Sequence, residues 1–104
     1  MRKALKVTTE LKYEVLDLDA PAGSLKVLQG AVGGLIQPAV FVPGYELYVN
    51  EEGIILDLPI NPWLALMTGF PLRGDGVITG DVDDEGETLG LTDEQITALT
   101  NYLM

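Results

Sequence analysis

The residues best suited to acid/base chemistry are the neighbouring carboxylates Glu51 and Glu52, which precede Gly53. Acid/base catalysis needs a second group within reach, but adjacent residues on a strand or turn point apart, and no nucleophile or metal ligand accompanies them. Histidine and cysteine are absent from the 104 residues, and Ser24 is the only serine. These absences exclude a Cys/His zinc site, a Ser-His-Asp triad and a Cys-His pair. The sequence therefore favours a non-enzymatic protein without a cofactor.

The acidic run 81–87 resembles part of a calcium-binding loop. Asp81, Asp83 and Glu85 match the ligand positions 1, 3 and 5 of such a loop, and Gly86 matches the glycine at position 6 that makes its sharp turn. Position 12, which requires a bidentate glutamate, is Thr92, and that residue is better explained as a helix cap. The spacing therefore predicts a solvated loop tip and no metal site.

Charge is distributed unevenly along the chain. The segment up to Lys26 holds five of the six basic residues against four acids, whereas the segment from Gly74 onward holds eight acids and no base. The net charge of -10 lies mainly in this last third, which repels nucleic acid and anionic lipid and favours a partner protein with a basic patch. The predicted contacts in this third are Asp83, Asp84, Glu85 and Glu87.

A second candidate surface surrounds the polar corner 50–53. Arg73 is the only basic residue after Lys26, so it is the expected contact for an anionic ligand; the alternative is a surface arginine that bridges to Asp57 or Asp75. The alternation of the preceding strand puts Tyr48 on the face opposite Leu47 and Val49, free for a partner if no helix covers that face. The candidate residues here are Tyr48, Asn50, Glu51, Glu52, Asn61, Arg73 and Asp75.

Membrane insertion is not expected, because the longest uncharged run, Leu58–Leu72, is too short to span a bilayer and contains three prolines. The absence of cysteine fixes no compartment, and a cytosolic location is the simpler interpretation.

The first half of the chain predicts a hairpin, a helix and a strand. The segments Ala4–Thr8 and Leu11–Val15 alternate like half-buried strands on either side of a corner. Ser24 is expected to cap a helix that buries Leu25, Leu28 and Val32 and ends at Gly33-Gly34. Leu35–Val42 is apolar on both faces and predicts a central strand, with Pro38 at a bulge or an unpaired end.

The second half begins with a type II turn over Val42-Pro43-Gly44-Tyr45, followed by the strand Tyr45–Val49. Asn61 and Pro62 begin a short helix anchored by Trp63 and ended by Gly69, and Gly74–Asp81 forms the last strand. Thr92 and Gln95 form a capping box at the start of the terminal helix, with Leu91 and Ile96 as its hydrophobic staple. The predicted buried stripe of that helix is Ile96, Leu99 and Leu103.

These elements predict one α+β domain spanning residues 1–104. The order is ββαββαβα, with a mostly antiparallel sheet of about five strands and two or three short helices covering one face of the sheet.

Several motifs together resemble a family of small domains of unknown function found in genes of bacteriophages, plasmids and other mobile elements. They are Tyr48-Val49-Asn50-Glu51-Glu52-Gly53, Leu58-Pro59, Asn61-Pro62, Gly74-Asp75 and Gly90-Leu91-Thr92-Asp93-Glu94-Gln95. The resemblance implies a phage or mobile-element accessory protein, and it brings no catalytic residues with it. Trp63 departs from the small residue expected after Asn61-Pro62, which predicts that any pocket at that corner is filled.

Three functions remain open. The first is a protein that binds and inhibits a host factor through its acidic surface, in counter-defence or host takeover within the bacterial cytoplasm; a DNA-mimic version is less favoured because the acids concentrate in one loop. The second is an oligomeric sponge for a small nucleotide signal, with Arg73, Lys26 and Tyr48 as contacts. The third is a small carboxylate- or metal-dependent enzyme using Glu51 or Glu52.

Overall fold

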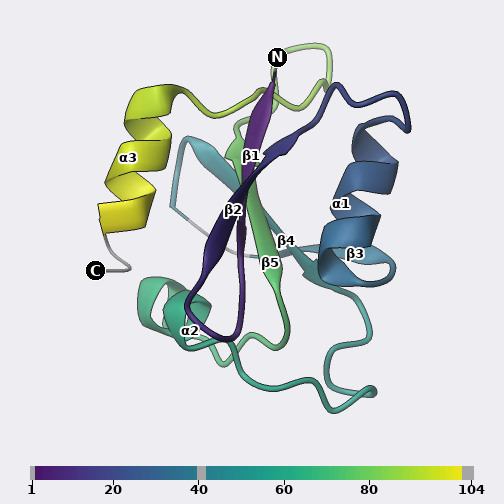
Figure 1. Ribbon diagram of the computed structural model, residues 1–104, viewed down its shortest axis with the longest axis vertical. Coiled ribbons are helices and arrows are strands. Elements are labelled where there is room, and N and C mark those ends of the chain that lie inside the picture. The colour runs from purple at the N-terminus through teal and green to yellow at the C-terminus, as the bar shows by residue number, and fades with distance from the viewer. Residues whose placement is uncertain (1, 40–41, 102–104) are drawn as a thin grey trace.

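A computed structural model describes residues 2–39 and 42–101, and it confirms an α+β fold with the predicted order ββαββαβα (Figure 1). The strands are β1 (Lys3–Val7), β2 (Tyr13–Asp17), β3 (Ile36–Ala39), β4 (Tyr45–Asn50) and β5 (Gly76–Gly80). The helices are α1 (Ser24–Val32), α2 (Pro62–Thr68) and α3 (Asp93–Asn101). Within the described residues, no helix combines the length and apolar character needed to cross a membrane.

The five strands form one antiparallel sheet in the order β2-β1-β5-β4-β3. Two hairpins, β1–β2 and β3–β4, flank β5, and all five residues of β5 are buried. The predicted central strand over Leu35–Val42 is therefore wrong, because β3 is a four-residue edge strand with Gln37 and Pro38 exposed. Pro38 lacks the N–H that a central strand would need on its second side, and an edge tolerates that loss.

Helices cover both faces of the sheet, which corrects the expectation that they cover one (Figure 1). On one face, α2 and α3 bury Trp63, Leu64 and Leu99 against a cluster drawn from β1, β4 and β5. On the other face, α1 buries Leu28 and Val32. The strands β1, β4 and β5 supply apolar side chains to both clusters, so each face of the sheet has its own core.

The β1–β2 hairpin is confirmed, but its second strand runs from Tyr13 to Asp17 and Leu11 lies in the turn with a φ of 62°. Tyr13 and Val15 stand opposite Val7 and Leu5, so they share the face that α2 and α3 cover elsewhere. They are nevertheless exposed, because the cluster on that face takes its strand residues from β1, β4 and β5.

The helix ends mostly follow the local signals. Asn61 caps α2 by accepting a hydrogen bond from the Leu64 N–H at 3.1 Å. Thr92 and Gln95 exchange hydrogen bonds of 2.9 and 3.1 Å, which confirms the capping box. The cap predicted at Ser24 is wrong: Gly23 precedes α1, Ser24 is its first residue, and no side chain caps it. Every glycine predicted to end a helix does so, since Gly33 and Gly69 both have φ of 78°.

The predicted buried stripe of α1 loses its first residue, whereas that of α3 agrees with the structure over the residues that the structure describes. Leu25 at the start of α1 is 53% exposed, although Leu28 and Val32 are buried as expected. In α3, Leu99 is buried and Ile96 packs against the same cluster as Leu91, which agrees with the predicted staple. Leu103 lies outside the described residues.

Candidate functional site

The loop 51–60 between β4 and α2 begins and ends beside a buried asparagine. Asn50 donates from Nδ2 to the Val32 carbonyl at 3.1 Å, and its Oδ1 accepts from the Glu52 N–H at 2.7 Å. Asn61, fully buried, donates from Nδ2 to the carbonyls of Val7 and Gly74 at 3.2 and 3.1 Å. Both amides are occupied by backbone partners, so these two candidates hold the loop in place and leave ligand contact to others.

Arg73 fixes the middle of the same loop from outside. Its Nη1 donates to the Leu58 carbonyl at 2.9 Å and lies 3.4 Å from Oδ1 of Asp57, which is the surface bridge that the sequence offered as the alternative to ligand binding. A β-bridge joins Arg73 to Ile60, and the Gly74 N–H donates to the Pro59 carbonyl at 2.8 Å. The loop is therefore tied down along its length by segments that lie outside it.

The side chains at the tip of this loop point into solvent. Ile54 and Ile55 are each 80% exposed and Leu56 is 53% exposed; we call these three residues the aliphatic loop. The exposed carboxylates Glu51, Glu52 and Asp57 surround it in the sequence. Exposed aliphatic side chains rimmed by charge are typical of a protein-interaction site.

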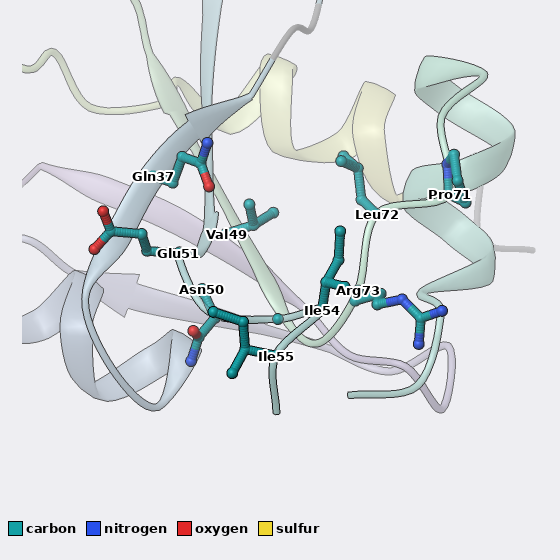
Figure 2. Close-up of a pocket in the computed structure, with 10 residues that line it drawn as sticks. Gln37, Val49, Asn50, Glu51, Ile54, Ile55, Pro71, Leu72 and Arg73 are labelled. Carbon is teal, nitrogen blue, oxygen red and sulfur yellow. The ribbon is translucent and has the colours of Figure 1, made fainter. Parts of the chain in front are cut away.

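A pocket of about 410 Å³ lies against the base of the aliphatic loop (Figure 2). Figure 2 shows Gln37 and Glu51 on one side of it and the segment 71–73 on the other. Carbon-rich side chains form much of the wall, and few polar groups converge there, as in many ligand sites. The lining residues are Gln37, Val49, Asn50, Glu51, Gly53, Ile54, Ile55, Pro71, Leu72 and Arg73.

The acidic run near the end of the chain forms a further short hairpin, residues 81–88, which we call the acidic hairpin. Val82 and Thr88 pair across it, and Oδ1 of Asp83 accepts the backbone N–H groups of Glu85 and Glu87 at 2.9 Å each. The carboxylate of Asp83 thus builds the turn. Nowhere in residues 2–39 and 42–101 do three or more acidic side chains gather in a way that could hold a metal ion.

The charge segregation seen along the chain is partly cancelled in space. Arg2 reaches Asp19 at 2.8 Å and Glu87 at 4.0 Å, and Lys3 reaches Asp93 at 2.7 Å. A hydrogen bond from the Arg2 backbone N–H, followed by one from its side chain, lowers the pKa of Asp19, and the hydrogen bond from Lys3 lowers the pKa of Asp93. Arg2 and Lys3 therefore lie beside acids from distant parts of the chain, including Glu87 and Asp93 near its end.

Asp75 and Tyr48 are also engaged within the fold. Asp75 accepts the Thr9 N–H at 3.1 Å and lies 3.7 Å from Lys6. Tyr48 occupies the predicted face, opposite Leu47 and Val49, but that face is covered by α1 and the ring packs against its cluster. Tyr48 is half-buried, so it is not free to contact a partner in the way expected for a face that no helix covers.

Of the predicted candidates, the pocket brings together Asn50, Glu51 and Arg73, and Glu52 is adjacent in the loop. The acidic hairpin, with Asp83, Asp84, Glu85 and Glu87, lies at the opposite end of the molecule (Figure 1). Sequence reasoning missed the aliphatic loop; the available signal was an apolar triplet, 54–56, bracketed by acids with neither helical nor strand alternation.

A family model described as a domain of unknown function (DUF3846) matches residues 1–104. The chain belongs to the DUF3846 family. This confirms the part of the resemblance that concerns a small domain of unknown function. No curated protein and no solved structure matched the chain. The DUF3846 assignment carries no activity, so the function rests on the geometry of the site.

Proposed function

We propose that this DUF3846 chain is a non-enzymatic binding protein that inserts its aliphatic loop into an apolar site on a partner protein with basic residues at its rim. One observation carries the proposal: Ile54 and Ile55 are each 80% exposed on a loop that is held at both ends and in the middle. An isoleucine side chain that moves from water into a protein interior contributes roughly 1.5–3 kcal/mol.

The way the loop is anchored supports this role. A loop that is ordered before binding loses little conformational entropy in the complex, so more of the burial energy remains as affinity. The described backbone hydrogen bonds inside the loop, such as Leu56 N–H to the Glu52 carbonyl at 2.8 Å and Leu58 N–H to the Gly53 carbonyl at 2.9 Å, keep it in one conformation. The loop is therefore arranged as a rigid apolar anchor.

The surrounding carboxylates set the chemistry of the partner. Glu51, Glu52 and Asp57 are exposed beside the aliphatic loop, and the net charge of -10 steers the whole chain toward basic surfaces. The acidic hairpin adds to this long-range attraction from the far end. Charge of this kind accelerates and orients encounter, while the aliphatic contacts determine how long the complex lasts.

The resemblance of the sequence motifs to a family found in mobile-element genes extends the proposal to a biological setting. A phage or mobile-element accessory protein without catalytic groups acts by occupancy, so the partner is a host factor that this chain inhibits in the bacterial cytoplasm. Counter-defence and host takeover both fit an inhibitor that works by stoichiometric binding.

In the test, tagged wild-type protein and three tagged variants are each incubated with host proteins. The host protein that each retains is then identified by native mass spectrometry. Ile54→Ser/Ile55→Ser should lose the retained protein, and Asp84→Lys/Glu85→Lys, which leaves the turn-building Asp83 in place, should only slow its capture. Leu66→Ser is the matched control, because Leu66 is 76% exposed on α2 and should not matter. The proposal is contradicted if Ile54→Ser/Ile55→Ser still retains the host protein. It is also contradicted if Leu66→Ser abolishes retention to the same extent. Equal melting temperatures establish that all variants are folded.

The pocket itself supports a second candidate, the nucleotide sponge, since a volume of about 410 Å³ accommodates a small ligand. Arg73 supplies positive charge there, but Glu51 lines the same pocket and Arg73 Nη1 already donates to Leu58. Lys26 lies on α1 and is not among the lining residues. Saturating nucleotides should raise the melting temperature if this candidate is correct, and an unchanged value across a nucleotide panel eliminates it.

A further inference from the structure

The two edges of the sheet are not equally protected. The β3 edge is four residues long and contains Pro38, which cannot donate a hydrogen bond to an added strand. The β2 edge is five residues long, lacks proline and exposes four of its five residues. An open edge of this kind is a template for pairing with another strand.

The alternation of hydrogen bonds between β1 and β2 shows which backbone N–H and C=O groups of β2 point away from the sheet. The Thr8 N–H donates to the Lys12 carbonyl and the Leu18 N–H donates to the Arg2 carbonyl, each at 2.8 Å. Hydrogen-bonded pairs alternate along an antiparallel ladder, so the even-numbered residues of β2 face β1. The backbone N–H and C=O groups of Tyr13, Val15 and Asp17 therefore point away from the sheet.

The side chains of the same residues leave an apolar strip along this edge. Tyr13 is 47% exposed and Val15 is 43% exposed, on the face where β1 already buries Leu5 and Val7. An additional strand beside β2 would cover both side chains and extend the sheet. The edge thus offers backbone groups and apolar area together.

The charge around β2 favours a second copy of the same strand as its partner. The chain as a whole carries -10, so two copies repel each other over most of their surfaces. Residues 2–18 hold four bases, Arg2, Lys3, Lys6 and Lys12, against the three acids Glu10, Glu14 and Asp17. Arg2, Lys3 and Lys6 are each paired with an acid from outside this segment, namely Asp19, Asp93 and Asp75, so the β1–β2 hairpin carries little net charge. Two copies therefore repel each other less along this hairpin than over the rest of their acidic surfaces.

We propose that β2 pairs with β2 of a second copy, antiparallel, with the two-fold axis at Val15, to give a continuous ten-stranded sheet from two five-stranded ones. In this register Val15 faces Val15 of the second copy and Tyr13 faces Asp17, so all three outward-facing residues pair. Centring on Glu14 would oppose two carboxylates. Centring on Tyr13 would require extended backbone at Leu11, whose φ is 62°.

The test uses the fact that the chain has no cysteine. Opposed residues in a hydrogen-bonded pair lie about 5.5 Å apart at Cα, within disulfide range, so Val15→Cys should form a covalent dimer on mild oxidation. Glu14→Cys and Gln37→Cys are the controls; Gln37 is exposed on the β3 edge. Comparable cross-linking of either control overturns the proposal, because it indicates another register or random collision.

A second measurement examines the wild-type chain by sedimentation over a concentration series. It should show a dimer, and Val15→Pro should weaken dimerisation about tenfold or more, since proline removes one outward N–H per copy and keeps the bonds to β1. A wild-type chain that stays monomeric up to about millimolar concentration overturns the proposal. So does a wild-type complex that contains a foreign strand in place of the second copy.

The dimer does not depend on the proposed binding function. Ile54→Ser/Ile55→Ser should sediment as the wild type does, because the aliphatic loop lies outside the β2 edge. Loss of dimerisation in that variant counts against the β2 pairing, whereas loss of host-protein retention with the dimer intact bears on the binding function alone.

Discussion

The loop 51–60, which carries the aliphatic loop, and the acidic hairpin are both rich in carboxylates, yet side chains support them in opposite ways. In the acidic hairpin, Asp83 uses its own carboxylate to hold the backbone of Glu85 and Glu87. In the loop 51–60, Asn50 and Arg73 hydrogen bond to the loop backbone from outside, and Asn61 fixes the end of the loop to Val7 and Gly74. The side chains at the loop tip are thereby free for a partner. A turn whose supports lie elsewhere can carry a binding surface, whereas a turn that supports itself uses up its polar groups.

Removal of the strongest support should have the largest effect. Asn61→Ala leaves the buried carbonyls of Val7 and Gly74 without their donor and the Leu64 N–H without its cap. We expect the free energy of unfolding, measured with urea, to fall by about 2–4 kcal/mol. The control is Asn101→Ala at an exposed position of α3, which should change it by less than about 0.5 kcal/mol. Equal effects of the two substitutions would refute the role given to Asn61.

The support in the middle of the loop should matter less for stability. Arg73→Met retains the aliphatic stem but removes the hydrogen bond to the Leu58 carbonyl, which should cost about 1–2 kcal/mol. Hydrogen exchange of the Leu56 and Asp57 amides should accelerate at the same time. Asp57→Asn is the control: the Asp57 side chain is 94% exposed, so it should alter neither quantity measurably. Slow exchange in Arg73→Met would show that the loop does not need this support.

The acidic hairpin should be disturbed locally by loss of its own support. Asp83→Ala removes the acceptor of two exposed backbone N–H groups and should lower the unfolding free energy by about 0.5–1 kcal/mol. The neighbouring substitution Asp84→Ala should leave stability unchanged within error. If both substitutions act alike, Asp83 has no special part in the turn and the comparison between the two regions fails.

The ion pairs of Arg2 with Asp19 and of Lys3 with Asp93 should give the smallest effect, visible as a pH dependence of stability. Arg2 and Lys3 lower the pKa of Asp19 and Asp93 below the ordinary value of 3.8. A carboxylate with a lowered folded-state pKa stabilises the fold above that ordinary value, and this contribution is lost as the pH falls through the folded-state pKa. The melting temperature of Asp19→Asn/Asp93→Asn should therefore fall less than that of the wild type between pH 6 and pH 3. Parallel curves would contradict the pairing.

The features of the fold that the sequence predicts correctly depend on interactions between residues only a few positions apart. Asn61 and Pro62 begin α2, and Thr92 with Gln95 begins α3, because capping needs only residues within one turn. Gly44, at a φ of 91°, fits the predicted type II turn for the same reason. The position of a strand within the sheet depends on pairings across the whole chain, so local patterns do not predict that Leu35–Val42 contributes an edge strand or that the helices divide between the two faces.

The candidate site follows the same division. The sequence directed attention to the corner 50–53 and to Arg73, which do meet in the pocket. It did not separate the structural asparagines from the exposed residues, because Asn50 and Asn61 are saturated by carbonyls as distant in sequence as Val32 and Val7. The exposure of Ile54 and Ile55 depends on which segments fail to cover them, and short-range patterns do not report that.

The place of β5 between the two hairpins also determines when this chain can fold during synthesis. The hairpins β1–β2 and β3–β4 are complete by Asn50, yet neither pairs directly with the other. The sheet that joins the two hairpins is incomplete until the ribosome has released Gly76–Gly80, so folding of the whole domain waits for the last quarter of the chain. During that interval the open β2 edge of each nascent chain is exposed to its neighbours on the same messenger RNA, which favours assembly of copies as they are made.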